Sequence, residues 1–137
     1  MISITSQFLA RVLSPRGHAY AHCDLPCGVY DPAQARIEAE SVKATQEKYQ
    51  GSDDPVFRER AIAIKEERAD MVKHHLWVLW TDYFKPEHLE KHPELHEAFW
   101  TATKEAGAAK KSEDPAQGQK LLDAVAKVDE IFWATKK

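Results

Sequence analysis

The chain has 137 residues, which suits one domain, and its composition of 43% apolar and 30% charged residues is that of an ordinary globular protein. Its net charge of -3 argues against nucleic acid as a partner, and no apolar run approaches the roughly 18 residues that a membrane-spanning helix requires. Alanine, Glu, Lys and Gln are abundant and glycines are few, which predicts an all-α fold.

The first 21 residues differ from the rest of the chain. They contain Arg11 and Arg16 but no acidic residue, which is typical of a leader removed on maturation; a chain starting at residue 22 would carry -3 - 2 = -5. Ala19-Tyr20-Ala21 has the small-x-small form of a signal-peptidase site, so export is one alternative. Because Arg11 interrupts the only apolar stretch, we favour a cytoplasmic pro-segment over residues 1–21.

The next segment, residues 22–30, gathers potential metal donors. It reads His-Cys-Asp-Leu-Pro-Cys-Gly-Val-Tyr, with His22 beside Cys23 and a second thiol at Cys27. Thiolates suit soft or borderline metals, and a planar set of nitrogen and sulfur donors favours nickel or copper over zinc, whose structural sites need four side-chain ligands. Cleavage before His22 would free an α-amine as a further donor, the Cys23 amide could complete the chelate, and the His22 ring could bind axially. A local disulfide or two ordinary thiols are the alternatives, because the chain has no other cysteine.

Three helix starts are marked by Asp followed by Pro, since Asp caps free N–H groups and Pro fits the first helical turn. The pairs are Asp31-Pro32, Asp54-Pro55 and Asp114-Pro115, and Gln34 and Gln117 complete capping-box patterns in the first and third. With a further start at Pro93, we expect helices over 32–49, 55–84, 93–107 and from 115 to near the C-terminus. Four amphipathic helices with short connections predict an antiparallel four-helix bundle over residues 31–137, preceded by a metal-binding hook at 22–30.

Helical spacing predicts which faces of these helices form the core. The first helix has a weak stripe of Ile37, Val42 and Ala44. The stripe of the second helix includes one charged residue and reads Phe57, Ala61, Ile64, Arg68, Met71, His75 and Val78. The third and fourth helices are expected to bury Leu95, Phe99, Ala102 and Ala106, and Leu121, Val125, Val128 and Phe132.

The run from His22 to Tyr30 resembles the nickel hook of the nickel-containing superoxide dismutases. The likeness continues through Asp-Pro-Ala-Gln-Ala-Arg-Ile-Glu-Ala-Glu at 31–40 and Asp-Tyr-Phe-Lys-Pro at 82–86, and covers essentially the whole chain after Ala21. It implies a superoxide dismutase that converts superoxide to oxygen and hydrogen peroxide while nickel cycles between Ni(III) and Ni(II). It also implies a homohexamer of four-helix bundles, one nickel ion per subunit and a processing peptidase.

The same resemblance implies roles for individual residues. The ligands would be His22 through its amine and ring, Cys23 through amide nitrogen and sulfur, and Cys27 through sulfur. Glu38 and Arg68 match residues that hold the axial imidazole, and Tyr30, Asp24 and Tyr83 would belong to the substrate pocket. On periodicity alone Glu38 reads as a solvated helical acid, Tyr83 as a packing residue and Lys85 as either a surface lysine or an attractor of the anionic substrate.

Three other interpretations of the sequence are a zinc site, a metal carrier and a purely structural bundle. His88, His92 and His96 are spaced by four, which on one continuous helix would align three imidazoles for zinc, but Pro93 interrupts the helix. A nickel or copper carrier could use the hook without turnover; an open approach to the metal favours the enzyme and a closed site the carrier. A purely structural bundle leaves the His-Cys-Asp-Leu-Pro-Cys run unexplained.

Overall fold

A computed structural model describes residues 27–137, so the predicted leader and residues 22–26 of the hook lie outside the described residues. Within 27–137 all regular structure is helical: α2 (Ala33–Gln50), α3 (Pro55–Val78), the π-helical turn η1 (Leu79–Tyr83), α4 (Pro86–Lys91), α5 (Leu95–Lys110) and α6 (Pro115–Ala134). None of these helices is long and apolar enough to cross a membrane.

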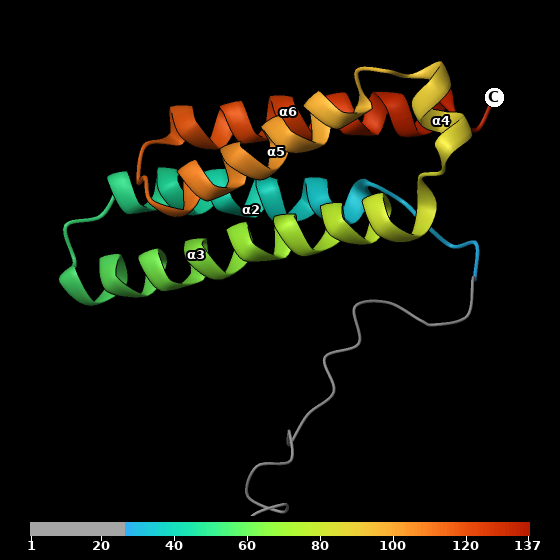
Figure 1. Cartoon of the computed structure of the whole chain (residues 1–137). Helices are drawn as coiled ribbons and strands as arrows, with labels where there is room; N and C mark the ends of the chain where they lie inside the picture. The colour runs from blue at the N-terminus through green and yellow to red at the C-terminus, as the bar shows by residue number, and fades with distance from the viewer. Residues whose placement is uncertain (1–26) are drawn as a thin grey trace, which may run out of the picture.

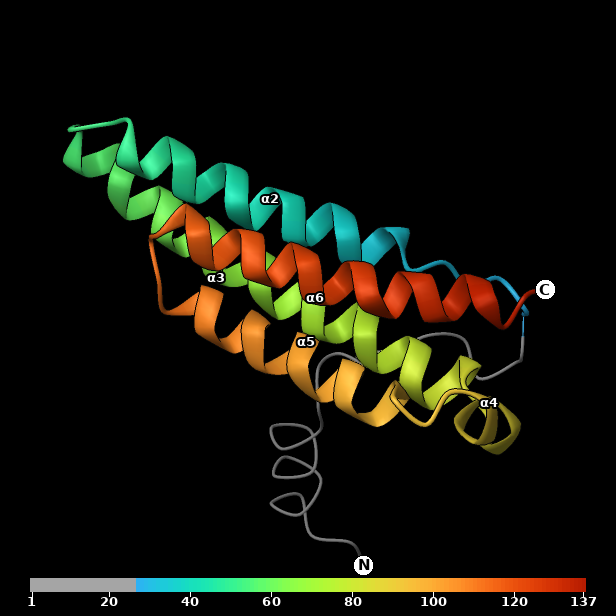
Figure 2. The same ribbon diagram turned by 90° about the horizontal axis from the view of Figure 1, so that it is seen from above.

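The four long helices lie side by side as an antiparallel bundle (Figures 1 and 2). Tight turns join α2 to α3 and α5 to α6 at one end of the bundle. At the opposite end η1 and α4 lead from α3 into α5, near the start of α2 and the C-terminal end of α6 (Figure 1). The predicted all-α bundle is confirmed, and the hook enters it at the end that carries η1, α4 and the C-terminus.

The Asp-Pro helix starts form largely as predicted. The carboxylate of Asp54 accepts the N–H of Val56 at 3.1 Å, and that of Asp114 accepts the N–H of Ala116 at 2.9 Å. The predicted capping box at Gln117 is wrong. Its amide instead donates to Glu105 of α5, and the Asp114 N–H that it would have satisfied donates to the Ser112 hydroxyl at 3.1 Å.

The core faces of α5 and α6 are confirmed, whereas those of α2 and α3 are confirmed only at Val42, Ala61 and Val78 and are otherwise corrected. The helix α3 buries Ala61, Lys65, Ala69, Val72, Leu76 and Val78, so Phe57 and Ile64 of the predicted stripe are 39% and 43% exposed. In α2 the buried residues are Ala35, Ala39, Val42 and Gln46, and the predicted Ile37 is exposed. The physical reason is that small alanines let the two backbones approach closely, which leaves the larger side chains on the rim.

The second predicted helix continues past α3 as η1 and ends at Tyr83, as expected before Pro86. The short helix α4 was not predicted, because its six residues lie between Pro86 and Pro93 and are too few to show a periodic pattern.

A buried lysine ties the α5–α6 turn to the other two helices. The side chain of Lys65 is almost fully buried, and its Nζ donates to the Ser112 carbonyl at 2.9 Å and to the Glu113 carboxylate at 3.1 Å. Gln46 of α2 donates to the same carbonyl at 2.9 Å. Because a buried ammonium without partners would strongly destabilise the fold, these bonds fix the turn in place.

We expect Gly118→Ala to destabilise the protein although alanine is the better helix former. A Cβ at position 118 would collide with Gln46 Oε1 and lie 2.8 Å from Cα of Lys43, so α2 and α6 would have to separate. The expected loss in the free energy of unfolding is about 1–3 kcal/mol, measured by denaturant titration.

Gly107→Ala is the matched control in α5. The nearest atom to a Cβ there is the flexible Lys73 Nζ at 3.4 Å, so this change should stabilise the helix by about 0.5–1 kcal/mol. Equal stabilities of the two variants would contradict the close approach of α2 and α6.

Candidate metal centre

The described part of the hook is a tight turn around the Cys27 sulfur. The Cys27 side chain is exposed, and the N–H of Val29 donates to its Sγ at 3.5 Å. Gly28 has φ +72°, in the left-handed region where a side chain is strained, so glycine is required for the turn. The Sγ of Cys27 also lies 3.9 Å from the Val29 carbonyl oxygen, to which the thiol can donate; a metal would take this sulfur in its deprotonated form. Cys27 therefore fits the role of a soft metal ligand.

The other predicted ligands, His22 and Cys23, and the pocket residue Asp24 lie outside the described residues, and their placement stays a prediction. Within residues 27–137 no three His, Cys, Asp or Glu side chains converge on a common metal position. The described part of the bundle thus shows no cluster of such side chains that competes with the hook as a metal site.

The rival zinc site at His88, His92 and His96 is wrong. The ring of His88 stacks on Tyr83 at 5.4 Å between centroids, and the ring of His96 packs on Trp80 at 4.8 Å. His92 lies after α4 and its Nδ1 is 3.4 Å from the Glu94 carboxylate. Because Pro93 ends the helical register, the three imidazoles point to three different partners.

Glu38 of α2 and Arg68 of α3, which the resemblance assigns to one role, face each other across the two helices. Arg68 Nη1 lies 3.2 and 3.4 Å from the two carboxylate oxygens of Glu38, and the Glu38 side chain is only 15% exposed. Arg68 also reaches Glu67 at 3.2 Å through its second amino group. The expectation that Glu38 is a solvated helical acid is wrong, although its role beside a metal ligand stays a prediction.

A pocket of about 200 Å³ opens beside Cys27, between the hook and the end of α3. Its lining residues are Cys27, Val29, Tyr30, Asp31, Gln34, His75, Val78 and Leu79. Burial lowers the pKa of His75, the neighbouring His74 lowers it further, and Glu38 opposes both by raising it. His75 is therefore neutral at neutral pH. The sequence assigned it to the core stripe, and its place at the pocket depends on the pairing of α2 with α3.

A second pocket of about 290 Å³ lies on the other side of the hook turn. Its lining residues are Gly28, Tyr30, Asp82, Tyr83, Lys85, His88 and Lys136. The predicted pair Tyr30 and Tyr83 comes together here, with ring centroids 5.7 Å apart. Tyr83 also packs on Phe132 at 4.4 Å, and its hydroxyl hydrogen-bonds to Thr135 at 2.6 Å. Tyr83 therefore both packs and lines the pocket.

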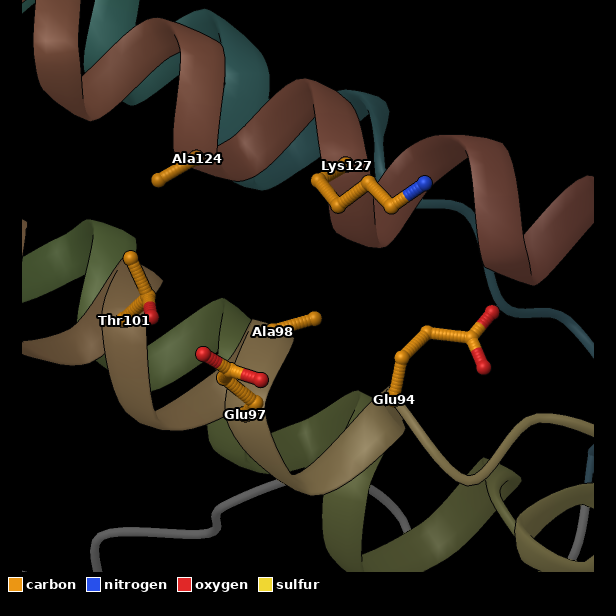
Figure 3. A pocket seen from close by; sticks show the side chains of 6 residues that line it. All are labelled: Glu94, Glu97, Ala98, Thr101, Ala124 and Lys127. Carbon is orange, nitrogen blue, oxygen red and sulfur yellow. The ribbon is translucent and has the colours of Figure 1, made fainter.

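A third pocket, of about 170 Å³, lies between α5 and α6 (Figure 3). Glu94 and Lys127 lie at the same end of the pocket, and Ala98 and Ala124 line it from the two facing helices (Figure 3). It contains neither sulfur nor imidazole, the donors that a nickel or copper ion would take, so it is not a candidate for the metal centre.

The described residues form an all-α bundle of four long helices, with an exposed cysteine in the turn before α2 and two small pockets beside that turn. The chain matches the family model of the nickel-containing superoxide dismutases over residues 17–136. The nickel superoxide dismutases of Streptomyces coelicolor and Streptomyces seoulensis are 63% and 62% identical to it over 129 residues, 94% of this chain and 98% of each relative.

Solved structures give the same result. A native nickel superoxide dismutase aligns with a TM-score of 0.82 and 66% identity, covering 85% of this chain and 100% of that one. An apo structure aligns with a TM-score of 0.78 and 64% identity, covering 80% and 98%. The chain belongs to the nickel-containing superoxide dismutase family, and the prediction of a nickel-dependent oxidoreductase acting on superoxide is confirmed.

The titration of His75 tests the electrostatics of this end of the bundle. Glu38→Gln should lower the pKa of His75 because it removes the carboxylate that raises it, and His74→Gln should raise that pKa by removing a like charge. Imidazole NMR signals of the metal-free protein measure both changes. Glu40→Gln, on the exposed side of α2, is the control. A shift in the same direction for both variants would contradict the arrangement.

The lowered pKa of His75 in the folded protein sets how stability depends on pH. The contribution of His75 to the free energy of unfolding is fully present above its unfolded-state pKa of about 6.5, and it is lost as the pH falls from there through the lower folded-state pKa. In Glu38→Gln the loss on acidification should be larger, because the folded pKa is lower still.

Proposed function

We propose that this chain disproportionates superoxide with a nickel ion held by His22, Cys23 and Cys27. Its membership in the family and the hook sequence support the proposal. The observation that carries it is the exposed Cys27 sulfur, which accepts an N–H and faces a pocket open to a small anion. When bound, nickel supplies the one-electron chemistry, by alternating between Ni(III) and Ni(II).

In this proposal the chain's own residues position the ligands and the substrate. The ion pair of Glu38 and Arg68 fixes the orientation and basicity of the His22 ring, because such partners set how an imidazole ligand points. The phenols of Tyr30 and Tyr83, with Asp24, hold water or the small anion without binding the metal. Pockets on both sides of the hook turn leave room for that anion, which favours an enzyme over a metal carrier.

In the proposed maturation step a cytoplasmic processing peptidase removes residues 1–21. The alternative is export, with cleavage by a signal peptidase after Ala19-Tyr20-Ala21. The leader's lack of acidic residues supports removal, and the family match begins only at residue 17. The alignment with the native solved structure covers all of that structure but 85% of this chain, whereas the alignments with the Streptomyces sequences cover 94% of this chain. This difference is in keeping with a mature enzyme that is shorter than its precursor.

The α-amine of His22 can be tested separately from every other donor. We expect one alanine added before His22 to leave the bundle folded but to weaken nickel binding and suppress dismutase activity, because the amine becomes an amide. The comparison uses the chain starting at His22 and the extended chain, both refolded with nickel. Nickel content, superoxide decay and helical circular dichroism are measured on each.

Cys27→Ser in the chain starting at His22 is the companion variant. It should also lose nickel and activity with unchanged helicity, since the sulfur is exposed and outside the core. If the alanine extension retained full activity while Cys27→Ser did not, the thiolate would stand as a ligand and the amine would not.

We also propose that the mature protein is a homohexamer. Trp77, Trp100 and Trp133 are exposed in the single chain, and large aromatic side chains are typical of subunit interfaces. Light scattering of the nickel-loaded protein should give six times the subunit mass. A fully active monomer would contradict this assembly.

A further inference from the structure

The pocket shared by Tyr30 and Tyr83 is also lined by a residue from the opposite end of the chain. Lys136 follows α6, whose C-terminal end lies at the same end of the bundle as the hook and α4 (Figure 1). It is the one lining residue that the C-terminal segment contributes. The lysine therefore reaches the substrate pocket only because the bundle folds α6 back beside η1.

Contacts of its own side chain and of the preceding residue hold Lys136 at this pocket. Its Nζ lies 4.8 Å from the centroid of the Tyr83 ring and 5.3 Å from that of Phe132, distances at which an ammonium is attracted to an aromatic face. The preceding residue, Thr135, hydrogen-bonds both to the Tyr83 hydroxyl and to the Phe132 carbonyl, each at 2.6 Å. The C-terminal segment is thus fastened to the tyrosine that forms the pocket wall.

The charges around the pocket favour a small anion. Lys85 and Lys136 line it with one carboxylate, that of Asp82. Neither lysine forms an ion pair with any residue in 27–137, so both positive charges are available to the pocket. Superoxide is a monoanion, and a chain with a net charge of -3 repels it at long range. Local cations beside the approach route counter that repulsion and raise the encounter rate.

We propose that Lys136, together with Lys85, forms the anion-attracting approach to the nickel centre and guides superoxide into the pocket of Tyr30 and Tyr83. The inference rests on the proposed function of the hook. Lys136 acts on the encounter step: it raises kcat/KM through charge and does not exchange electrons or protons with the substrate. Its contribution must therefore depend on ionic strength, which a purely structural role would not.

The test compares Lys136→Gln, Lys136→Arg and the control Lys137→Gln in the nickel-loaded enzyme. Lys137 is also exposed and carries the same charge, but it does not line the pocket. Superoxide decay is followed from about 0.01 to about 0.5 M ionic strength, with nickel content measured for each variant. Lys136→Gln should lower kcat/KM about threefold at low ionic strength, the effect of one unit charge a few ångströms away, and the difference should vanish at high salt. Lys136→Arg should match the parent enzyme, and Lys137→Gln should have a clearly smaller effect than Lys136→Gln, because only Lys136 lines the pocket.

Azide, a small monoanion, gives a readout that does not need nickel. Its binding is followed by NMR shifts of the Gly28 and Tyr83 amides in the metal-free chain, and it should weaken about threefold in Lys136→Gln but not in Lys137→Gln. Equal effects of the two Gln variants in both experiments, or a salt-independent loss that Lys136→Arg does not restore, would overturn the inference. An inactive nickel-loaded parent with the expected azide result would refute the proposed metal site and, with it, the guidance of superoxide to nickel, and would leave only the attraction of small anions by Lys136.

Discussion

The packing of α2 against α3 sets the geometry on which the rest of the site depends. Alanines at 35, 39 and 69 are fully buried between the helices, so the two backbones lie close and their register is fixed. In this register Glu38 meets Arg68 and, two turns further along α3, His75 meets the segment that leads from the hook. A slip of either helix would break the ion pair and move the hook away from its pocket.

The two ends of the bundle are stabilised by different interactions. At the turn end, Lys65 and Gln46 converge on the Ser112 carbonyl, and this buried polar cluster attaches α5 and α6 to the first helix pair. At the hook end the contacts are aromatic, with Tyr83 between Phe132 and His88. Directional hydrogen bonds fix the position of a turn, whereas aromatic packing provides a wall beside which a small polar pocket can stay open.

Much of this structure could be predicted from local sequence, and the remainder depends on distant contacts. The Asp-Pro pairs locate helix starts because capping is local, and the hook identifies the metal chemistry because its donors are adjacent in the chain. The buried face of α3 could not be read in the same way: Lys65 looks like a surface residue until its two acceptors, from a turn 47 residues away, are known. His75 and Lys136 are missed for the same reason, since only the fold brings them to the pockets.

The proposed metal ligands and the other residues of the site come from separate parts of the chain. The proposed metal donors belong to a short N-terminal segment, whereas Tyr83, which lines the proposed substrate pocket, is held by Phe132 of α6 and by Thr135 directly after it. The ion pair of Glu38 and Arg68 likewise forms between two helices of the bundle, α2 and α3. In the proposed maturation, the new N-terminus and the bound nickel would therefore be added to a core whose buried residues, in the described part of the chain, lie outside the hook.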